Sequence, residues 1–131
     1  MFSLTLAPGP HIDVKSKNHQ WHYANDGSRP NPLESTYAAL AGCAGVYAKK
    51  ACRELGIDDA GIAISMRNMV KAGQTLIPAR IVTTVEFPER FTTEQRAVVL
   101  ESIQQCAVKK VMQHGPDIAF LVEEEAGTTV D

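Results

Sequence analysis

The sequence predicts an α+β protein in which an antiparallel sheet is combined with two main helices. Three observations indicate this class. Short strand-like runs fill the first thirty residues, a long helical period begins at Pro32, and two β-branched runs precede a second helical segment. Separate runs of strands and helices are typical of an α+β architecture. With 131 residues, the chain has the length of one domain, which we expect to span residues 1–131.

The first strands are expected in three short segments before residue 24. Leu4–Ala7 is predicted as a weak strand that ends at Pro8. His11–Lys15 alternates polar and apolar side chains, and Trp21–Tyr23 is its expected hairpin partner.

A long helix is predicted from Pro32 to Leu55, because apolar residues recur there at steps of three and four. Asn31 is a suitable cap, Pro32 suits the first helical position, and Gly56 suits the stop. Nearly all residues from 38 to 45 are small. We therefore expect another backbone or a partner subunit to approach this helix closely, so that it is buried on more than one side.

The second half of the chain is predicted to contain a strand pair, a helix and a final strand. Gly61–Val70 and Leu76–Phe87 have strand patterns, joined by a turn over Lys71–Gln74. A helix is expected to begin at Thr92 or Thr93 and to continue until just before Gly115. Ile118–Val122 is the last predicted strand.

Composition excludes several classes of function. The formal net charge is −2, aromatic residues make up 6%, and the sequence contains no block of basic residues, so we expect no nucleic-acid partner. No stretch approaches the roughly 20 apolar residues of a membrane helix, so we expect no membrane partner. Met1–Pro10 lacks the pattern of a signal peptide, which favours a cytoplasmic protein. Three cysteines are then expected to be reduced thiols.

Two cysteines are the candidate reactive groups. Cys43 and Cys106 each lie in a predicted helix, and a thiol becomes a good nucleophile when a cation or a helix dipole favours the thiolate. Their spacing alone also fits two buried, unreactive core residues. Cys52 follows Cys43 by nine residues and so faces the opposite side of the helix, which predicts a core residue. His19 and His22 fall on opposite faces of a strand, and we expect neither a metal site nor a cofactor.

Two segments resemble the OsmC/Ohr family. The run NPLESTYAALAGC (residues 31–43) is similar to the signature of its first cysteine, and QCAVKKV (residues 105–111) is similar to the segment of its second cysteine. The resemblance covers roughly residues 12–122. It implies the OsmC-like fold and a swapped, intertwined homodimer with active sites at the subunit interface. It also implies that Cys43 attacks an organic hydroperoxide and that Cys106 resolves the sulfenic acid as a disulfide. A dithiol reductant, lipoyl-type in the Ohr branch, then restores both thiols.

Three positions depart from the family pattern. Leu33 stands where Ohr-type enzymes have a glutamate, and the neighbouring carboxylate is Glu34. Arg29 is the only arginine before the long helix and lies in a loop. Cys106 is followed by Ala107 in place of the usual proline. Glu34 and Arg29 are therefore the candidate partners of the reactive thiol.

The leading hypothesis is a thiol-dependent peroxidase with an apolar pocket, for which Tyr37, Leu40 and Met66 are candidate lining residues. The first alternative is a non-catalytic dimer that binds a small apolar or thiol-bearing ligand. The second is a redox sensor that transmits the state of the same cysteines to a partner.

Overall fold

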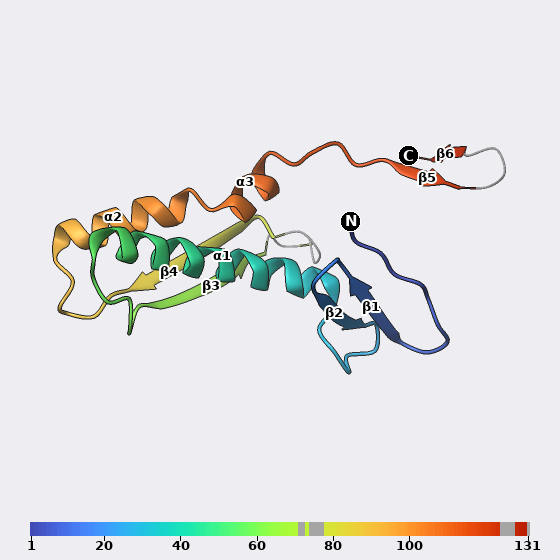
Figure 1. Cartoon of the computed structure of the whole chain (residues 1–131), viewed down its shortest axis with the longest axis horizontal. Helices are drawn as coiled ribbons and strands as arrows, with labels where there is room; N and C mark the ends of the chain where they lie inside the picture. Colours follow the sequence, from blue (N-terminus) through green and yellow to red (C-terminus); the bar gives the residue numbers. More distant parts are fainter. Residues whose placement is uncertain (71–72, 74–77, 124–127, 131) are drawn as a thin grey trace.

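A computed structural model describes residues 1–70, 73, 78–123 and 128–130. Three helices and six strands are found in this described part of the chain, in the order seen in Figure 1. The elements are β1 (His11–Lys15), β2 (Gln20–Ala24), α1 (Pro32–Leu55), β3 (Ala63–Met69), β4 (Arg80–Glu86), α2 (Thr93–Gln104), α3 (Ala107–Gln113), β5 (Phe120–Val122) and β6 (Thr128–Val130).

The strands form three separate antiparallel hairpins, β1–β2, β3–β4 and β5–β6. In the first, Ile12 lies opposite Tyr23 and Val14 opposite Trp21, which confirms the predicted pairing. In the second, Ile64 lies opposite Val85 and forms part of the face that packs against the helices. The α+β class and the antiparallel strands are therefore confirmed.

Helix α1 begins and ends where its capping residues predict. The Asn31 side chain accepts a hydrogen bond from the Glu34 backbone N–H at 2.8 Å, and Pro32 occupies the first turn. Gly56 ends the helix with a φ of 69°, in the left-handed region that glycine adopts without strain. Helix α2 is capped by Thr92, whose hydroxyl accepts from the Gln95 backbone N–H. The Gln95 side chain returns a bond to the Thr92 N–H and completes a capping box.

The prediction of one continuous second helix is wrong, because the chain breaks between Gln104 and Ala107. The amides of Gln105 and Cys106 bond the carbonyls three residues back, at 3.0 and 3.1 Å, which tightens the last turn of α2. Cys106 then adopts an extended conformation, with φ −51° and ψ 125°, and its sulfur caps the start of α3. No glycine or proline signals this break in the sequence.

The predicted strands at the two ends of the chain also need correction. Leu4–Ala7 forms no strand, because the pairing of the N-terminal segment with β1 is limited to Ser3 and Lys15. The last predicted strand is shorter than expected, and its partner β6 was not predicted. The predicted turn over Lys71–Gln74, apart from Gly73, lies outside the described residues, as does the start of the predicted strand at Leu76.

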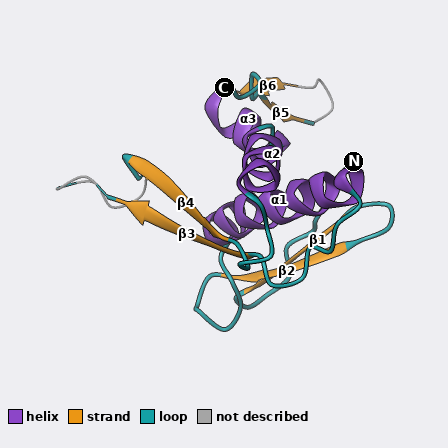
Figure 2. Cartoon of the chain, turned by 90° about the vertical axis from the view of Figure 1, so that its left-hand side faces the viewer, coloured by secondary structure: helices purple, strands orange, loops and turns teal. Residues whose placement is uncertain are grey.

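The core lies where α1, α2 and the β3–β4 hairpin meet, and α2 packs over α1 (Figures 1 and 2). Its buried residues are Ala48, Ala51, Cys52, Phe91 and Val99. Cys52 is completely buried, which confirms its prediction as a core residue. Among the described helices, none is long and apolar enough to cross a membrane.

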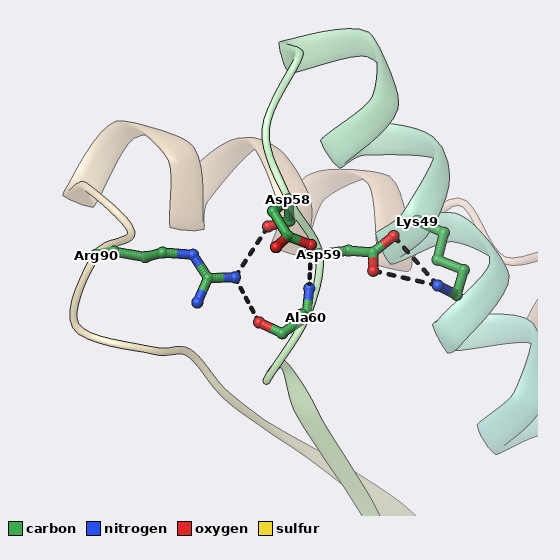
Figure 3. Close-up of polar contacts among 5 residues, drawn as sticks. All are labelled: Lys49, Asp58, Asp59, Ala60 and Arg90. Carbon is green, nitrogen blue, oxygen red and sulfur yellow. Dashed lines mark hydrogen bonds and ion pairs between the residues drawn. The ribbon is translucent and has the colours of Figure 1, made fainter.

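A polar clamp joins the connection between α1 and β3 to the connection between β4 and α2 (Figure 3). The Arg90 guanidinium donates hydrogen bonds to the backbone carbonyls of Asp58 and Ala60. The Lys49 ammonium lies 3.2 Å from the Asp59 carboxylate and ties the same loop to α1. The clamp therefore fixes the β3–β4 hairpin relative to the helix that carries Cys43.

The C-terminal segment leaves the core after α3. Figure 1 shows it running away from the helices to the β5–β6 hairpin. Its apolar side chains are exposed in this single chain, with exposed fractions of 76% for Ile118, 63% for Phe120 and 70% for Leu121. This arm therefore presents an apolar surface that no other part of the described chain covers.

Candidate active site

The structure brings Cys43 and Cys106 together, although they come from different helical elements. Cys43 lies in the middle of α1 and is half-buried, while Cys106 lies between α2 and α3 and is only 2% exposed. The Cys106 thiol forms a hydrogen bond with the Cys43 sulfur. Both are free thiols, so the pair is reduced.

The break between α2 and α3 is what directs Cys106 toward α1. Because Cys106 has left the helical conformation, its sulfur turns back over the first turn of α3 and accepts from the Lys109 N–H at 3.5 Å. The same turn directs the backbone N–H groups of Ala107 and Val108 to the sulfur of Cys43. The break in the helix thus places a second thiol and two backbone hydrogen-bond donors next to the sulfur of Cys43.

The two thiols have opposite tendencies to ionise. Burial acts to raise the pKa of Cys43, but hydrogen bonds from the Cys106 thiol and from the Val108 and Ala107 N–H groups outweigh it and lower that pKa. Burial and the hydrogen bond with Cys43 raise the pKa of Cys106. Groups with such divergent environments take different roles in catalysis. Cys43 is therefore the thiol that ionises first, and Cys106 holds its proton.

Arg29 and Glu34 lie apart from this pair in the single chain. The Arg29 guanidinium is 2.9 Å from Asp13, whose carboxylate also lies 2.6 Å from the His22 ring. Glu34 precedes Cys43 by nine residues, which places it about 13 Å back along α1 and on the opposite side. Arg29 and Glu34 do line one shared hollow of about 410 Å³. Within the described residues, no charged side chain contributes to the pKa shift of Cys43.

A groove of about 730 Å³ adjoins the thiol pair on the Cys106 side. Tyr37 and Leu40, both candidate pocket residues, line it from α1. Its other walls come from β4, α2 and α3, and they combine apolar side chains with polar and charged ones. Met66, the third candidate, lies on β3 opposite Thr83, which itself lines the groove. The groove is therefore wide enough for a small apolar molecule beside Cys106.

The sequence does not predict two elements of the site. The donors from Ala107 and Val108 are backbone groups, and they depend on a helix break that the sequence does not signal. Ser102, on the last turn of α2, donates a hydrogen bond to the Tyr47 carbonyl at 2.9 Å and so joins α1, which carries Cys43, to the helix that precedes Cys106. The only sign of this contact in the sequence is a serine, Ser102, inside the predicted second helix.

Comparisons with known proteins agree with this arrangement of elements. The model of the family described as OsmC-like protein matches residues 25–120. Among solved structures, an OsmC-like protein from Mycoplasma pneumoniae has a TM-score of 0.67 at 12% identity, covering 87% of this chain and 86% of its own. A protein from Psychrobacter arcticus 273-4, described as an osmotic stress induced and detoxification response protein, has a TM-score of 0.70 at 14% identity. It covers 87% of this chain and 88% of its own. No curated protein matches the sequence significantly.

Proposed function

Because the chain belongs to the family of OsmC-like proteins, we propose that it is a thiol-dependent peroxidase of the Ohr type that reduces organic hydroperoxides. The observation that carries this proposal is the asymmetric thiol pair. Hydrogen bonds lower the pKa of Cys43, while burial and the contact with Cys43 raise that of Cys106. A nucleophile and a resolving group are thereby distinguished within one pair.

In the first step the Cys43 thiolate attacks the terminal oxygen of the hydroperoxide. The O–O bond breaks, Cys43 becomes a sulfenic acid, and an alkoxide leaves. Cys106 still carries its proton and lies within hydrogen-bond reach of Cys43, so it can protonate the alkoxide to the alcohol. That transfer leaves Cys106 as a thiolate, which is the form needed for the next step.

In the second step the Cys106 thiolate attacks the sulfur of the Cys43 sulfenic acid. The S–O bond breaks, hydroxide leaves, and a Cys43–Cys106 disulfide forms, which prevents irreversible oxidation to the sulfinic acid. An external dithiol, of the lipoyl type in this proposal, reduces the disulfide by exchange and is itself oxidised. The peroxide is thus reduced to an alcohol and water with two electrons from the dithiol.

The proposal includes a homodimer with the thiol pair near the subunit interface. It is supported by the exposed apolar arm that carries Phe120 and Leu121. It is also supported by the side of α1 that carries Gly42 and Val46, which is exposed in the single chain and has open space beside Gly42. Sedimentation of the reduced protein is expected to give a dimer, and a monomer at micromolar concentration would remove the interfacial site from the proposal.

The test is a thiol count after oxidation by one equivalent of cumene hydroperoxide. The reduced chain has three thiols, and after denaturation we expect one, Cys52, to remain. Cys43→Ser should consume no peroxide, whereas Cys52→Ser, the matched control, should still lose two thiols. A folded wild-type protein that keeps all three thiols would refute the peroxidase.

A second function is favoured by one observation, the groove beside Cys106. In that case the protein binds a small apolar ligand without reducing it. A binding protein would retain its thiols in the oxidation experiment and would bind an apolar fluorescent probe that a bulky substitution at Leu40 displaces.

A further inference from the structure

We propose that Ser102 is a positioning residue that holds Cys43 and Cys106 in register for disulfide formation. The inference rests on the proposed function, in which the two sulfurs must meet. It concerns a residue that touches neither sulfur and acts through the two helices.

The hydrogen bond of Ser102 lies one helical turn from Cys43 along α1 and four residues before Cys106, which follows the end of α2. Its hydroxyl donates to the Tyr47 backbone carbonyl at 2.9 Å. Tyr47 follows Cys43 by four residues, and Ser102 precedes Cys106 by four. Residues four apart lie on the same face of an α-helix, one above the other, so Tyr47 lies on the face of α1 that carries Cys43. The bond therefore fixes α2 against the face of α1 that carries the reactive thiol.

Ser102 is also part of the turn that carries Cys106. Its own carbonyl accepts from the Gln105 N–H at 3.0 Å, and the next bond, from the Cys106 N–H to the Ile103 carbonyl, completes the turn. The side chain of Ser102 thus anchors to α1, while its backbone anchors the turn that ends at Cys106. If Ser102 moves along α1, the sulfur of Cys106 moves with it, because only four residues separate them.

The packing between the helices explains why a directional bond is needed here. The buried residues of α1 are small, namely Ala44, Ala48, Ala51 and Cys52. Small side chains form only shallow ridges on a helix, and apolar contacts have no preferred direction. Packing of this kind therefore only weakly determines how far one helix is shifted along the axis of the other. A disulfide requires the two Cα atoms to lie about 4.4–6.8 Å apart. A shift of about 1 Å can slow a reaction as much as a hundredfold when it displaces the reacting atoms.

The choice of serine is not explained by the helix itself. Alanine is a better helix former than serine, and a serine inside a helix commonly bonds the carbonyl four residues before it. Ser102 instead bonds a carbonyl on another helix, 55 positions away in sequence. The side chain therefore serves the contact between helices.

The test compares Ser102→Ala with Ser102→Thr, which keeps the hydroxyl, and with Thr92→Ala as a matched control. Thr92 caps the other end of α2, so its loss destabilises the same helix without touching the bond to Tyr47. Each variant is equilibrated with glutathione and glutathione disulfide, and the fraction of Cys43–Cys106 disulfide is measured by mass spectrometry. We expect Ser102→Ala to lower the equilibrium constant for this disulfide about tenfold, with Ser102→Thr and Thr92→Ala within about threefold of wild type.

The kinetic readout uses peroxide. With excess tert-butyl hydroperoxide, Ser102→Ala should convert several times more Cys43 to the sulfinic acid, because resolution by Cys106 is slower. The first oxidation of Cys43 is measured in a Cys106→Ser background, where adding Ser102→Ala should leave the rate equal to that of Cys106→Ser alone.

The glutathione experiment needs no peroxidase activity, so it separates the two proposals. Wild-type protein that ignores peroxide refutes the proposed function, while a lowered disulfide constant in Ser102→Ala still supports the positioning role. The inference is overturned if folded Ser102→Ala forms the disulfide as readily as wild type, or if Thr92→Ala weakens it equally.

Discussion

Replacing Ala107 by proline removes one hydrogen-bond donor from the candidate active site and little else. Ala107 is exposed and occupies the first position of α3, where proline is well tolerated. The residue before a proline must be extended, and Cys106 already has a ψ of 125°. Proline therefore fits the existing backbone. The change removes the N–H that bonds the Cys43 sulfur and raises the pKa of that thiol.

The size of the effect follows from the nature of the lost bond. Hydrogen bonds to charged groups contribute roughly 1.5–3 kcal/mol. Cys43 is half-buried, and water can replace part of the lost interaction, so the lower end of this range applies. About 1.5 kcal/mol corresponds to a roughly tenfold smaller thiolate fraction at neutral pH. Because only the thiolate attacks peroxide, the rate of the first oxidation should fall by a similar factor.

The assay is the pH dependence of Cys43 alkylation by iodoacetamide, followed on the Cys43 peptide by mass spectrometry. The rate rises with pH as the thiol ionises, so the midpoint of the Ala107→Pro profile should move to higher pH. Ala107→Ser keeps the N–H and is the matched control, for which we expect the wild-type profile. A proline variant whose profile coincides with wild type would show that this N–H does not stabilise the thiolate.

Three further changes test the site and the fold. Cys106→Ser should leave Cys43 to be oxidised by excess peroxide to the sulfinic acid, visible as a gain of two oxygens in the intact mass; accumulation of a stable sulfenic acid would contradict the protective role of Cys106. Val99→Ala empties a fully buried core position and should cost about 2–3 kcal/mol in urea unfolding, or roughly 6–12 °C in Tm; a loss below about 1 kcal/mol would place Val99 outside the core. Gly61→Ala should destabilise the fold by about 1–3 kcal/mol, since Gly61 has a φ of 88° and a Cβ there would lie 3.0 Å from the Pro88 ring; an unchanged unfolding midpoint would refute that strain.

The elements that could be predicted from the sequence are those fixed by nearby residues. Asn31, Pro32 and Gly56 set the ends of α1 through bonds within one helical turn, and these ends were correct. The β1–β2 pairing followed from alternating side chains separated by a short turn. Such local signals need no knowledge of the rest of the fold.

The elements that could not be predicted depend on contacts between distant segments. The break before α3 is capped by a thiol, which is not a recognised capping side chain, and its place is set by packing against α1. Arg29 could be chosen from the sequence as a candidate cation. Its bond to Asp13, however, joins the loop after β2 to β1 across the hairpin, and no local pattern indicates it. The position of Cys43 and Cys106 in predicted helical segments makes them candidates but leaves the core interpretation open, and the family resemblance is what favours a reactive pair.

The cap that Cys106 provides for α3 links helix dynamics to the chemical state of the sulfur. In the reduced protein this sulfur accepts from the Lys109 N–H. A disulfide to Cys43 would move the Cys106 sulfur away from the Lys109 N–H and make it a weaker acceptor. The first turn of α3 would then lose this capping hydrogen bond each time the disulfide forms. Lys109 and Met112 belong to one wall of the groove, which would become more mobile once the peroxide has been consumed. In the proposed reaction, the alcohol would then leave and the reductant would enter when the disulfide has formed.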